Sequence, residues 1–244
     1  MAGDHFSGHA ADYAKFRPGY PAALFDWIAA QTPGHDLAWD CGCGNGQASV
    51  PLAERYRRIA ATDFSAEQIA QATPHPRIDY RAAPAEASGL PDGCADLVTI
   101  AQALHWFDFD RFYAEVRRVV KPGGAIVAWT YQLLRAEPAI DTVLADFYTH
   151  TLGPHWPPER KWVDLAYRGM PFPFEKIATP QFEIRLQWSL ADLLAYLGTW
   201  SATQRYRKAE GRDPLTALDE RLAPAWGEGV REIVWPIAIK AGRV

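Results

Sequence analysis

Three glycines at alternate positions, Gly42, Gly44 and Gly46, are the residues of this chain that best predict chemistry. They follow a short apolar stretch that ends in an acidic residue, Asp40, and they precede residues that are compatible with a helix. Because glycine has no Cβ, it adopts positive φ without strain and lets a ligand lie against the peptide plane. The pattern therefore predicts a buried strand, a ligand-binding loop and the start of a helix.

A second acidic residue, Asp63, ends the next apolar run and lies 21 residues after Gly42. In nucleotide-binding α/β proteins, a carboxylate about 20 residues beyond the loop holds the ribose hydroxyls. The two motifs together predict a nucleoside-containing cofactor. Gln47 stands where a dinucleotide-binding loop has its third glycine, and no Gly-Lys-Ser/Thr triplet follows for a phosphate. Asp40 suits an ammonium or a sulfonium, which favours S-adenosylmethionine over a cofactor with a pyrophosphate.

At these residues the chain resembles the class I S-adenosylmethionine-dependent methyltransferases. Asp40 and the three glycines match the acidic residue and G-x-G-x-G of the family, and Asp63 matches the acidic end of its second strand. Residues 90–98 and 120–124 are similar to two later family motifs, so that four motifs follow in order over residues 35–130. Within the methyltransferase type 11 group, residues 13–21 and 101–106 resemble the small-molecule branch that includes trans-aconitate-methyltransferase-like proteins.

The resemblance implies a set of cofactor-binding residues. Family members carry an acidic residue for the adenine amino group where this chain has Pro84, so we expect that contact from the backbone around Ala85 or from Glu86. In the same branch an N-terminal segment closes over the cofactor, and it would bring Tyr13 and Arg17 to it. The implied cofactor-binding set is Asp40, Gly42, Cys43, Gly44, Asn45, Gly46, Asp63, Phe64, Ser65, Ala85, Glu86, Gln102, Tyr13 and Arg17.

The loop after the fourth predicted strand carries the candidate acceptor-side residues, because open α/β sheets bind substrates beyond the carboxyl ends of their strands. His105 is predicted to act as a base or as a hydrogen-bond donor to the acceptor, and its alternative is a packed histidine that caps the next helix. Trp106 is expected in the pocket wall or in the core, and Tyr20 on the substrate side. Six late tryptophans, of which a few are expected to line the acceptor pocket, are Trp156, Trp162, Trp188, Trp200, Trp226 and Trp235.

These residues predict the transfer of a methyl group from S-adenosylmethionine to a small-molecule acceptor, a carboxylate or a hydroxyl, with S-adenosylhomocysteine as the product. Two alternatives stay open: a non-catalytic S-adenosylmethionine-binding protein and, less favoured, an NAD(P)-dependent oxidoreductase. Gln47 and the alternating strand near residue 185 disfavour the oxidoreductase.

The composition of the chain restricts its possible partners, its location and its metal binding. The net charge of −4 and the lack of a basic run disfavour nucleic acid as a partner. No run of 18 apolar residues or signal peptide is present, which predicts a cytoplasmic protein without a membrane span. The cysteines Cys41, Cys43 and Cys94 and the seven histidines lack metal-binding spacings, so no metal is expected. Composition leaves the oligomeric state open.

The elements that position the site follow from apolar runs. Strands predicted at 37–40, 59–62, 78–81, 97–101 and 125–129 alternate with helices, and their continuous apolar character is typical of a buried parallel sheet. We therefore expect an α/β, Rossmann-like doubly wound sheet with helices on both faces. The family resemblance adds an antiparallel C-terminal hairpin, and Pro236 in the last strand predicts an edge, a bulge or a strand end.

One domain is expected over residues 1–244. It comprises an N-terminal lid at 1–20, a cofactor-binding core at 35–130, and helical or irregular cap insertions on the substrate side at 131–180 and 190–229. Helices are predicted around 140–147, from Ser189 and from Asp213, with a proline-rich irregular segment at 153–174.

Overall fold

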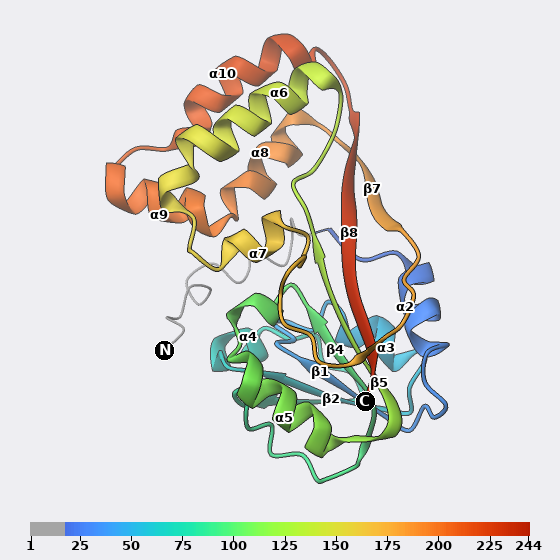
Figure 1. The fold of residues 1–244 in the computed structure, drawn as a ribbon. Coiled ribbons are helices and arrows are strands. Elements are labelled where there is room, and N and C mark those ends of the chain that lie inside the picture. The colour runs from blue at the N-terminus through green and yellow to red at the C-terminus, as the bar shows by residue number, and fades with distance from the viewer. Residues whose placement is uncertain (1–17) are drawn as a thin grey trace.

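The computed structural model describes residues 18–244, which form one eight-stranded sheet below a helical cap (Figure 1). The strand order is β3-β2-β1-β4-β5-β8-β6, and β7 also pairs with β8. β1 to β5 are parallel, whereas β8 runs antiparallel to β5, β6 and β7. The strands are β1 Leu37–Cys41, β2 Arg58–Asp63, β3 Ile78–Ala82, β4 Ala95–Ala101, β5 Val120–Tyr131, β6 Glu175–Lys176, β7 Phe182–Trp188 and β8 Arg231–Arg243.

The helices divide between the sheet and the cap. Those of the sheet are α2 Ala22–Ala29, α3 Ser49–Ala53, α4 Ala66–Ala70, the short 3-10 helix η1 Leu104–Trp106 and α5 Phe109–Val119. Those of the cap are α6 Pro138–Asp146, η2 Phe147–Thr151, η3 Gly153–His155, α7 Arg160–Asp164, α8 Leu190–Gly198, α9 Ser201–Glu210 and α10 Pro214–Trp226.

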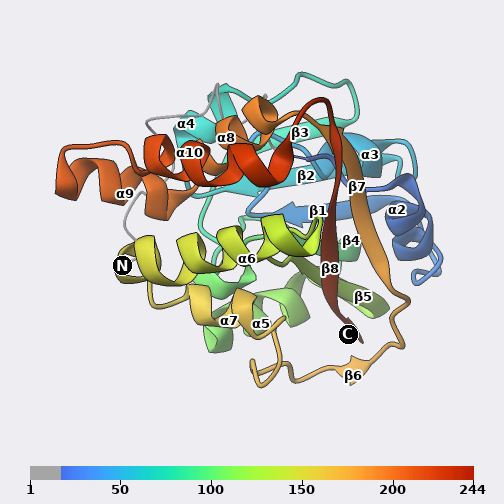
Figure 2. The same cartoon turned by 90° about the horizontal axis from the view of Figure 1, so that it is seen from above.

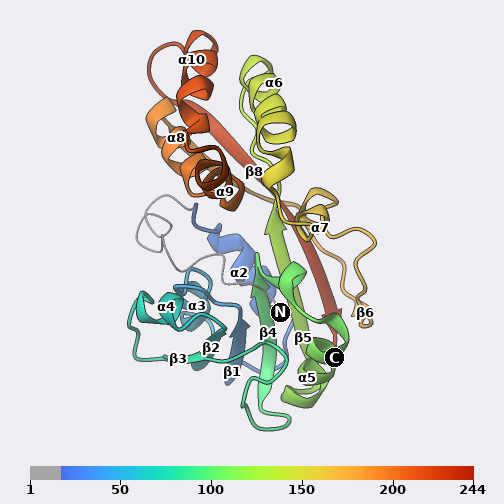
Figure 3. The same ribbon diagram turned by 90° about the vertical axis from the view of Figure 1, so that its left-hand side faces the viewer.

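Helices cover both faces of the parallel strands, as predicted. One apolar cluster packs α2, α3 and Ile69 of α4 against one face, and a second packs α5 against the other (Figure 3). Residues along β4 are buried without alternation, because neither face of the strand meets water. The strand order reverses between β1 and β4, and ligands of doubly wound sheets bind in the crevice at such a point.

The antiparallel strands confirm the resemblance at the C-terminal end. Pro236 lies inside β8 and pairs with Glu183 of β7, but the pairing of β8 with β5 ends at Ile237, so on that side Pro236 lies beside a strand end. Its carbonyl accepts from the Gln132 N–H at 3.0 Å, just beyond the last residue of β5. The missing N–H of Pro236 therefore faces the side on which its neighbouring strand has already ended, and no ladder bond is lost.

The cap lies over the carboxyl ends of the parallel strands. Seen from above, α6 runs beside α10 (Figure 2), and α7 lies between the cap helices and the sheet (Figure 1). α9 was not predicted from the sequence, since its N-cap residue, Trp200, provides no side-chain cap. No helix in the described part of the chain combines the length and hydropathy that a membrane span requires.

Candidate functional site

The glycine loop after β1 is held against the end of β2. The N–H groups of Gly42 and Cys43 both donate to the Thr62 carbonyl, at 2.8 and 3.0 Å. Gly42, Gly44 and Gly46 have φ of 68°, 55° and 92°, in the left-handed region that glycine adopts without a Cβ clash. The predicted loop geometry is therefore present, and α3 begins at Ser49 with Pro51 in its first turn, where the missing N–H of proline has no helical partner to lose.

The three glycines of the loop have different surroundings. A Cβ on Gly42 would lie 2.6 Å from the Ala103 Cβ, and one on Gly46 would lie 2.3 Å from the Tyr80 hydroxyl. A Cβ on Gly44 would meet only the Gln68 side chain, at 3.8 Å. The outer glycines thus let neighbouring elements close on the loop, while the backbone at Gly44 borders open space in which a ligand fits.

Asp40 is fully buried at the end of β1. Its carboxylate oxygens accept from the Ser49 hydroxyl at 2.6 Å and from the Thr99 hydroxyl at 2.9 Å. Burial raises the pKa of Asp40 to about 6, although the two hydroxyl donors oppose that shift. In this arrangement the carboxylate ties β1 to β4 and to the start of α3, so it positions the loop; a direct contact with the cofactor stays a prediction.

Asp63 stands beside the loop, at the end of β2. One of its oxygens accepts from the Gly44 N–H and the other from the Ser65 N–H, each at 2.8 Å. A carboxylate oxygen accepts more than one hydrogen bond, so these contacts orient the group without excluding ribose hydroxyls. Ser65 caps α4 by accepting from the Gln68 N–H, while the neighbouring Phe64 is 71% exposed. Such an exposed ring beside the carboxylate predicted to bind the ribose suits the face of a base.

The segment after β3 lies close to the loop that follows β4. Ala85 is buried, and a Glu86 carboxylate oxygen accepts from the Asp108 N–H at 3.0 Å, just before α5. The Glu86 side chain thus supports the start of α5. Its contact with an adenine, and that of the backbone at Ala85, remain predictions.

A pocket opens where β4 and β5 end beneath the cap. Its walls come from the loop after β4, from the end of β5 and from α7, α8 and α9, which follow that loop by about 55 to 100 residues. The contact of Ala103 and Phe107 with Gly42 brings this pocket next to the glycine loop. The lining residues include Gln102, His105, Trp106, Tyr131, Gln132, Trp156, Arg160, Tyr196 and Trp200.

Gln102 enters this pocket with a strained backbone. Its φ is 60°, which is unusual for a residue other than glycine. The Thr130 hydroxyl donates to its Oε1 at 2.7 Å, whereas its Nε2 is buried and has no hydrogen-bond partner among residues 18–244. A buried donor without a partner is costly, and it points to a ligand atom that would accept from it. The side chain therefore reaches the pocket beneath the cap, while its neighbour Ala103 lies against the glycine loop.

His105 is also in the pocket wall, and it is 8% exposed. Its Nδ1 lies 3.3 Å from the Tyr167 hydroxyl. Burial, with a further contribution from the positive charge of Arg160, lowers the pKa of His105 to about 3. The imidazole is therefore neutral at physiological pH, which suits a hydrogen-bonding role better than a proton-accepting one.

The aromatic residues that were expected near the pocket lie in different parts of the structure. Trp156 and Trp200 line the pocket, as does Trp106. Trp226 and Trp235 belong to the buried core, Trp188 packs against Trp235, and Trp162 packs against Phe109. Tyr20 places its ring edge-on to Trp129, and its centroid is 6.5 Å from that of the pocket residue Tyr131. Tyr13 and Arg17, and with them the lid prediction, lie outside the described residues.

The sequence did not identify Arg160 and Tyr131 as pocket residues, because their place in the pocket depends on how the cap packs against the sheet. The only local signal was an arginine, flanked by Glu159 and Lys161, in a segment rich in prolines and tryptophans. Across residues 18–244, no group of three or more His, Cys, Asp or Glu side chains is arranged to hold a metal ion.

Known proteins share this sequence and fold. A family model described as "Methyltransferase domain" matches residues 39–128. A Dictyostelium discoideum protein described as a methyltransferase is 33% identical over 227 residues, which cover 91% of this chain and 86% of that protein. A Mycolicibacterium smegmatis protein described as an S-adenosylmethionine-dependent methyltransferase is 30% identical over 53% of this chain and 51% of its own length.

The solved structure of a protein described as a type II methyltransferase, from Anaeromyxobacter dehalogenans, is 48% identical and superposes with a TM-score of 0.87. The comparison covers 93% of this chain and 98% of that one. The similarity thus extends through the cap as well as the glycine loop. The chain belongs to the class I S-adenosylmethionine-dependent methyltransferases that carry the type 11 methyltransferase domain.

Proposed function

We propose that this enzyme methylates a carboxylate or hydroxyl oxygen of a small molecule that binds in the pocket beneath the cap. The observation that carries the proposal is the contact between Gly42 and Ala103, which joins the glycine loop to the wall of that pocket. An acceptor in the pocket is thereby adjacent to a cofactor on the loop, as an in-line displacement requires.

The residues of the loop fit S-adenosylmethionine, which supplies a methyl group on an activated sulfonium. Gly44 offers open space against its backbone, and Asp63 is oriented toward the same loop by the Gly44 N–H. We infer that Asp63 holds the ribose hydroxyls and that the exposed ring of Phe64 covers the adenine. Asp40 keeps the loop in position through Ser49 and Thr99.

On the acceptor side, the chain orients the oxygen and excludes water. Gln102 Nε2 is the donor placed to bind an acceptor oxygen, and His105 offers a neutral ring nitrogen in the same wall. A carboxylate already carries the negative charge that it needs for attack, so it requires no base, whereas a hydroxyl must lose a proton. A neutral His105 with a low pKa favours the carboxylate of these two acceptors.

Calorimetric titration with S-adenosylhomocysteine tests the cofactor site. We expect wild type to bind, and Asp63→Ala to bind more weakly by about 1.5–3 kcal/mol, the usual cost of a lost charge-assisted hydrogen bond. Asp79→Asn, on the exposed side of β3, serves as the matched carboxylate control and should bind as wild type does. Unchanged affinity in Asp63→Ala, or tighter binding of NAD than of S-adenosylhomocysteine by wild type, would contradict the assignment.

A further inference from the structure

Arg160 is the only charged side chain among the described residues that line the acceptor pocket. It is the first residue of α7, and its side chain is 23% exposed. Its charge affects two other buried groups: it adds to the effect of burial in lowering the pKa of His105, and it opposes the rise that burial causes in the pKa of Tyr167. A positive charge thus stands inside a largely aromatic hollow, where it is expensive unless something compensates it.

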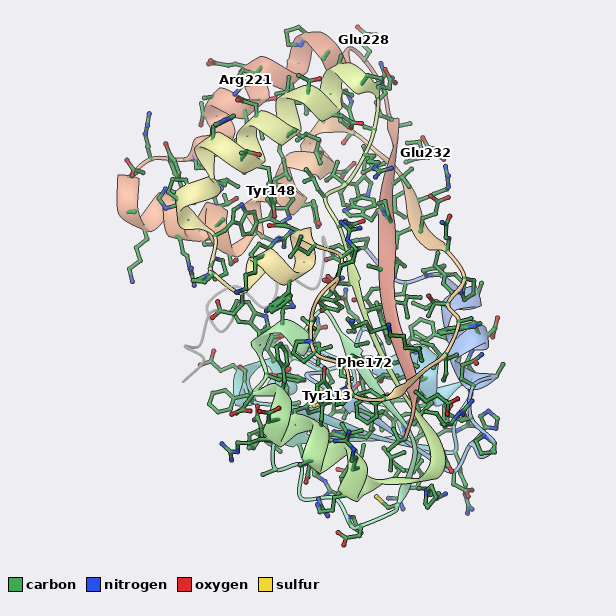
Figure 4. The ribbon with its side chains drawn as sticks, viewed as in Figure 1. Tyr113, Tyr148, Phe172, Arg221, Glu228 and Glu232 are labelled. Carbon is green, nitrogen blue, oxygen red and sulfur yellow. The ribbon has the colours of Figure 1, made fainter. Side chains whose placement is uncertain are left out.

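The guanidinium of Arg160 is held on one side only. Its Nε donates to the Tyr148 hydroxyl at 2.7 Å, and Asp164 lies 3.4 Å from the same nitrogen. The Tyr148 hydroxyl in turn donates to Asp164 at 2.5 Å. Figure 4 shows Tyr148 inside the cap, between α6 and α7. These contacts fix the direction of the guanidinium, and they involve the Nε edge alone.

The face of the guanidinium is fixed as well. Its central carbon lies 4.5 Å from the ring centroid of Trp156 and 5.4 Å from that of Tyr148. The two terminal amino groups make no hydrogen bond to any side chain or backbone group within residues 18–244. These groups present the planar fork that matches a carboxylate by two parallel hydrogen bonds.

Aromatic rings form much of the remaining pocket wall, beside the amide groups of Gln102 and Gln132 and the hydroxyl of Ser201. Trp106, Trp156 and Trp200 contribute broad ring faces, and Val163 adds an aliphatic side chain. Rings of this kind bind flat apolar groups, while a few polar groups fix the orientation of the ligand. One cation matches one anionic group, whereas a polycarboxylate or a phosphate dianion would need more positive charge than these walls provide.

We propose that Arg160 anchors the single carboxylate of a flat, aromatic acceptor, with the guanidinium held for this purpose by Tyr148 and Trp156. The inference rests on the proposed function in taking this pocket as the acceptor site. Recognition by Arg160 does not depend on which atom of the acceptor receives the methyl group.

The test compares apolar acids with their neutral analogues. Cinnamate, phenylacetate and indole-3-acetate, each with its primary amide, are titrated against wild type, Arg160→Gln, Arg160→Lys and Arg221→Gln. Arg221 is the matched control, because it forms an exposed ion pair with Asp146 on the outside of the cap (Figure 4). Binding is followed by calorimetry and by the fluorescence of the pocket tryptophans.

We expect wild type and Arg221→Gln to bind at least one acid about tenfold or more tightly than its amide, as a charge-assisted pair provides. In Arg160→Gln the acid and its amide should bind alike, and Arg160→Lys should fall between, since lysine keeps the charge without the planar fork. Acids and amides that bind wild type equally, or that both fail to bind, overturn the proposal, and so does a preference that persists in Arg160→Gln.

Affinity for S-adenosylhomocysteine separates this proposal from the proposed function. Arg160→Gln should keep that affinity and its thermal midpoint, because the cofactor loop lies outside its contacts. If wild type fails to bind S-adenosylhomocysteine yet discriminates acids from amides through Arg160, the proposed function is contradicted and the anion site stands. Should Arg160→Gln fail to fold, the comparison of acids with amides on wild type and Arg160→Lys still decides.

Discussion

Gln102 lowers the stability of the fold in two ways, through its backbone and through its side chain. A residue other than glycine at φ 60° is strained by about 1–2 kcal/mol, and its buried Nε2 lacks a partner among residues 18–244. Features of this kind persist where the surrounding structure enforces them for a functional reason. Here the side chain extends from the end of β4 into the acceptor pocket.

Replacing Gln102 with glycine should therefore separate stability from function. We expect Gln102→Gly to keep or raise the free energy of unfolding, by up to about 1 kcal/mol, because the strain is relieved. Binding of an apolar acid should weaken, because the amide donor is gone. Urea denaturation and ligand titration measure the two effects.

Gln102→Ala is the matched control, since it removes the same amide but keeps the strained backbone. It should bind the ligand as weakly as Gln102→Gly while being less stable than that variant. A wild type that is more stable than Gln102→Gly by 2 kcal/mol or more would mean that the Thr130 hydrogen bond, and not strain, dominates at this position.

His105 should make the protein sensitive to acid. Its pKa is about 3 in the fold and about 6.5 in the unfolded chain, so protonation favours unfolding. The stability that a neutral His105 contributes is fully present above pH 6.5 and is lost as the pH falls toward 3. His105→Gln should therefore lose less stability than wild type between pH 7 and pH 4.5, by about 2 kcal/mol.

Urea denaturation at the two pH values gives that difference. Carbon–proton correlation spectra add an independent reading, because the ring signal that disappears in His105→Gln identifies His105. That signal should not shift between pH 8 and pH 5. A titration near pH 6.5 would show a solvated imidazole and would restore the role of a general base.

At the scale of elements, α5 is tied to the loop before β4 through one buried carboxylate. Glu115 accepts from the N–H and the hydroxyl of Ser88, and the Arg118 guanidinium meets both of its oxygens, at 2.7 and 2.8 Å. Arg118 leads the interactions that lower the pKa of Glu115 to about 2. Because Glu86 in the same loop supports the start of α5, this tie also steadies the predicted adenine side of the site.

Glu115→Gln should lower the free energy of unfolding by about 2 kcal/mol at pH 7, since the charge-assisted contacts are lost. The depressed pKa means that this stabilisation is present above pH 4.5 and disappears as the pH falls toward 2. The difference between wild type and variant, measured by urea denaturation, should therefore shrink at pH 3. Asp92→Asn, which removes the exposed partner of Arg118, should change little. A difference for Glu115→Gln that is independent of pH would show that packing, not charge, accounts for it.

The sequence predicted best those helices and strands that are marked by their own residues, such as an apolar run or a capping side chain. The continuous apolar runs of β1 and β4 follow from burial on both faces. The side chains of Ser65 and Ser189 cap the N-termini of α4 and α8. α9 has no such cap, and Pro236 is tolerated only because β5 ends beside it. The register between β5 and β8 depends on how the two strands pair in the folded protein, so the sequence around Pro236 alone does not predict it.

The same distinction holds for the site. The geometry of the glycine loop was predictable, because a G-x-G-x-G run after a strand permits few arrangements. Which of the late tryptophans join Arg160 and Gln102 in the pocket was not predictable, since the cap brings together residues about 55 to 100 positions apart. Their local sequence contains no period or motif that marks a pocket.

At the scale of the whole molecule, the sheet and the cap share one core. A single apolar cluster runs from Leu24 of α2 through Trp129 of β5 to Trp226 of α10. We therefore expect one cooperative unfolding transition, with equal calorimetric and van't Hoff enthalpies. Trp226→Ala, which empties a buried site in the cap, should cost about 3–5 kcal/mol and speed amide exchange in β1 as well as in α10.

Leu165→Ala provides the control, because that side chain is 45% exposed and should contribute little. Two calorimetric transitions, of which Trp226→Ala moves only one, would show that the cap and the sheet unfold separately.

Trp188 and Arg231 are register partners at the ends of β7 and β8, so α8, α9 and α10 leave the sheet and return to it at one point. Residues 189–230 therefore form one insertion between two paired strand ends. This insertion supplies Tyr196 and Trp200 to the pocket, and Arg160 and Gln102 come from elsewhere in the chain. Substitutions at Tyr196 and Trp200 can therefore reshape one wall of the pocket while Arg160, Gln102 and the glycine loop, which belong to other segments, stay as they are.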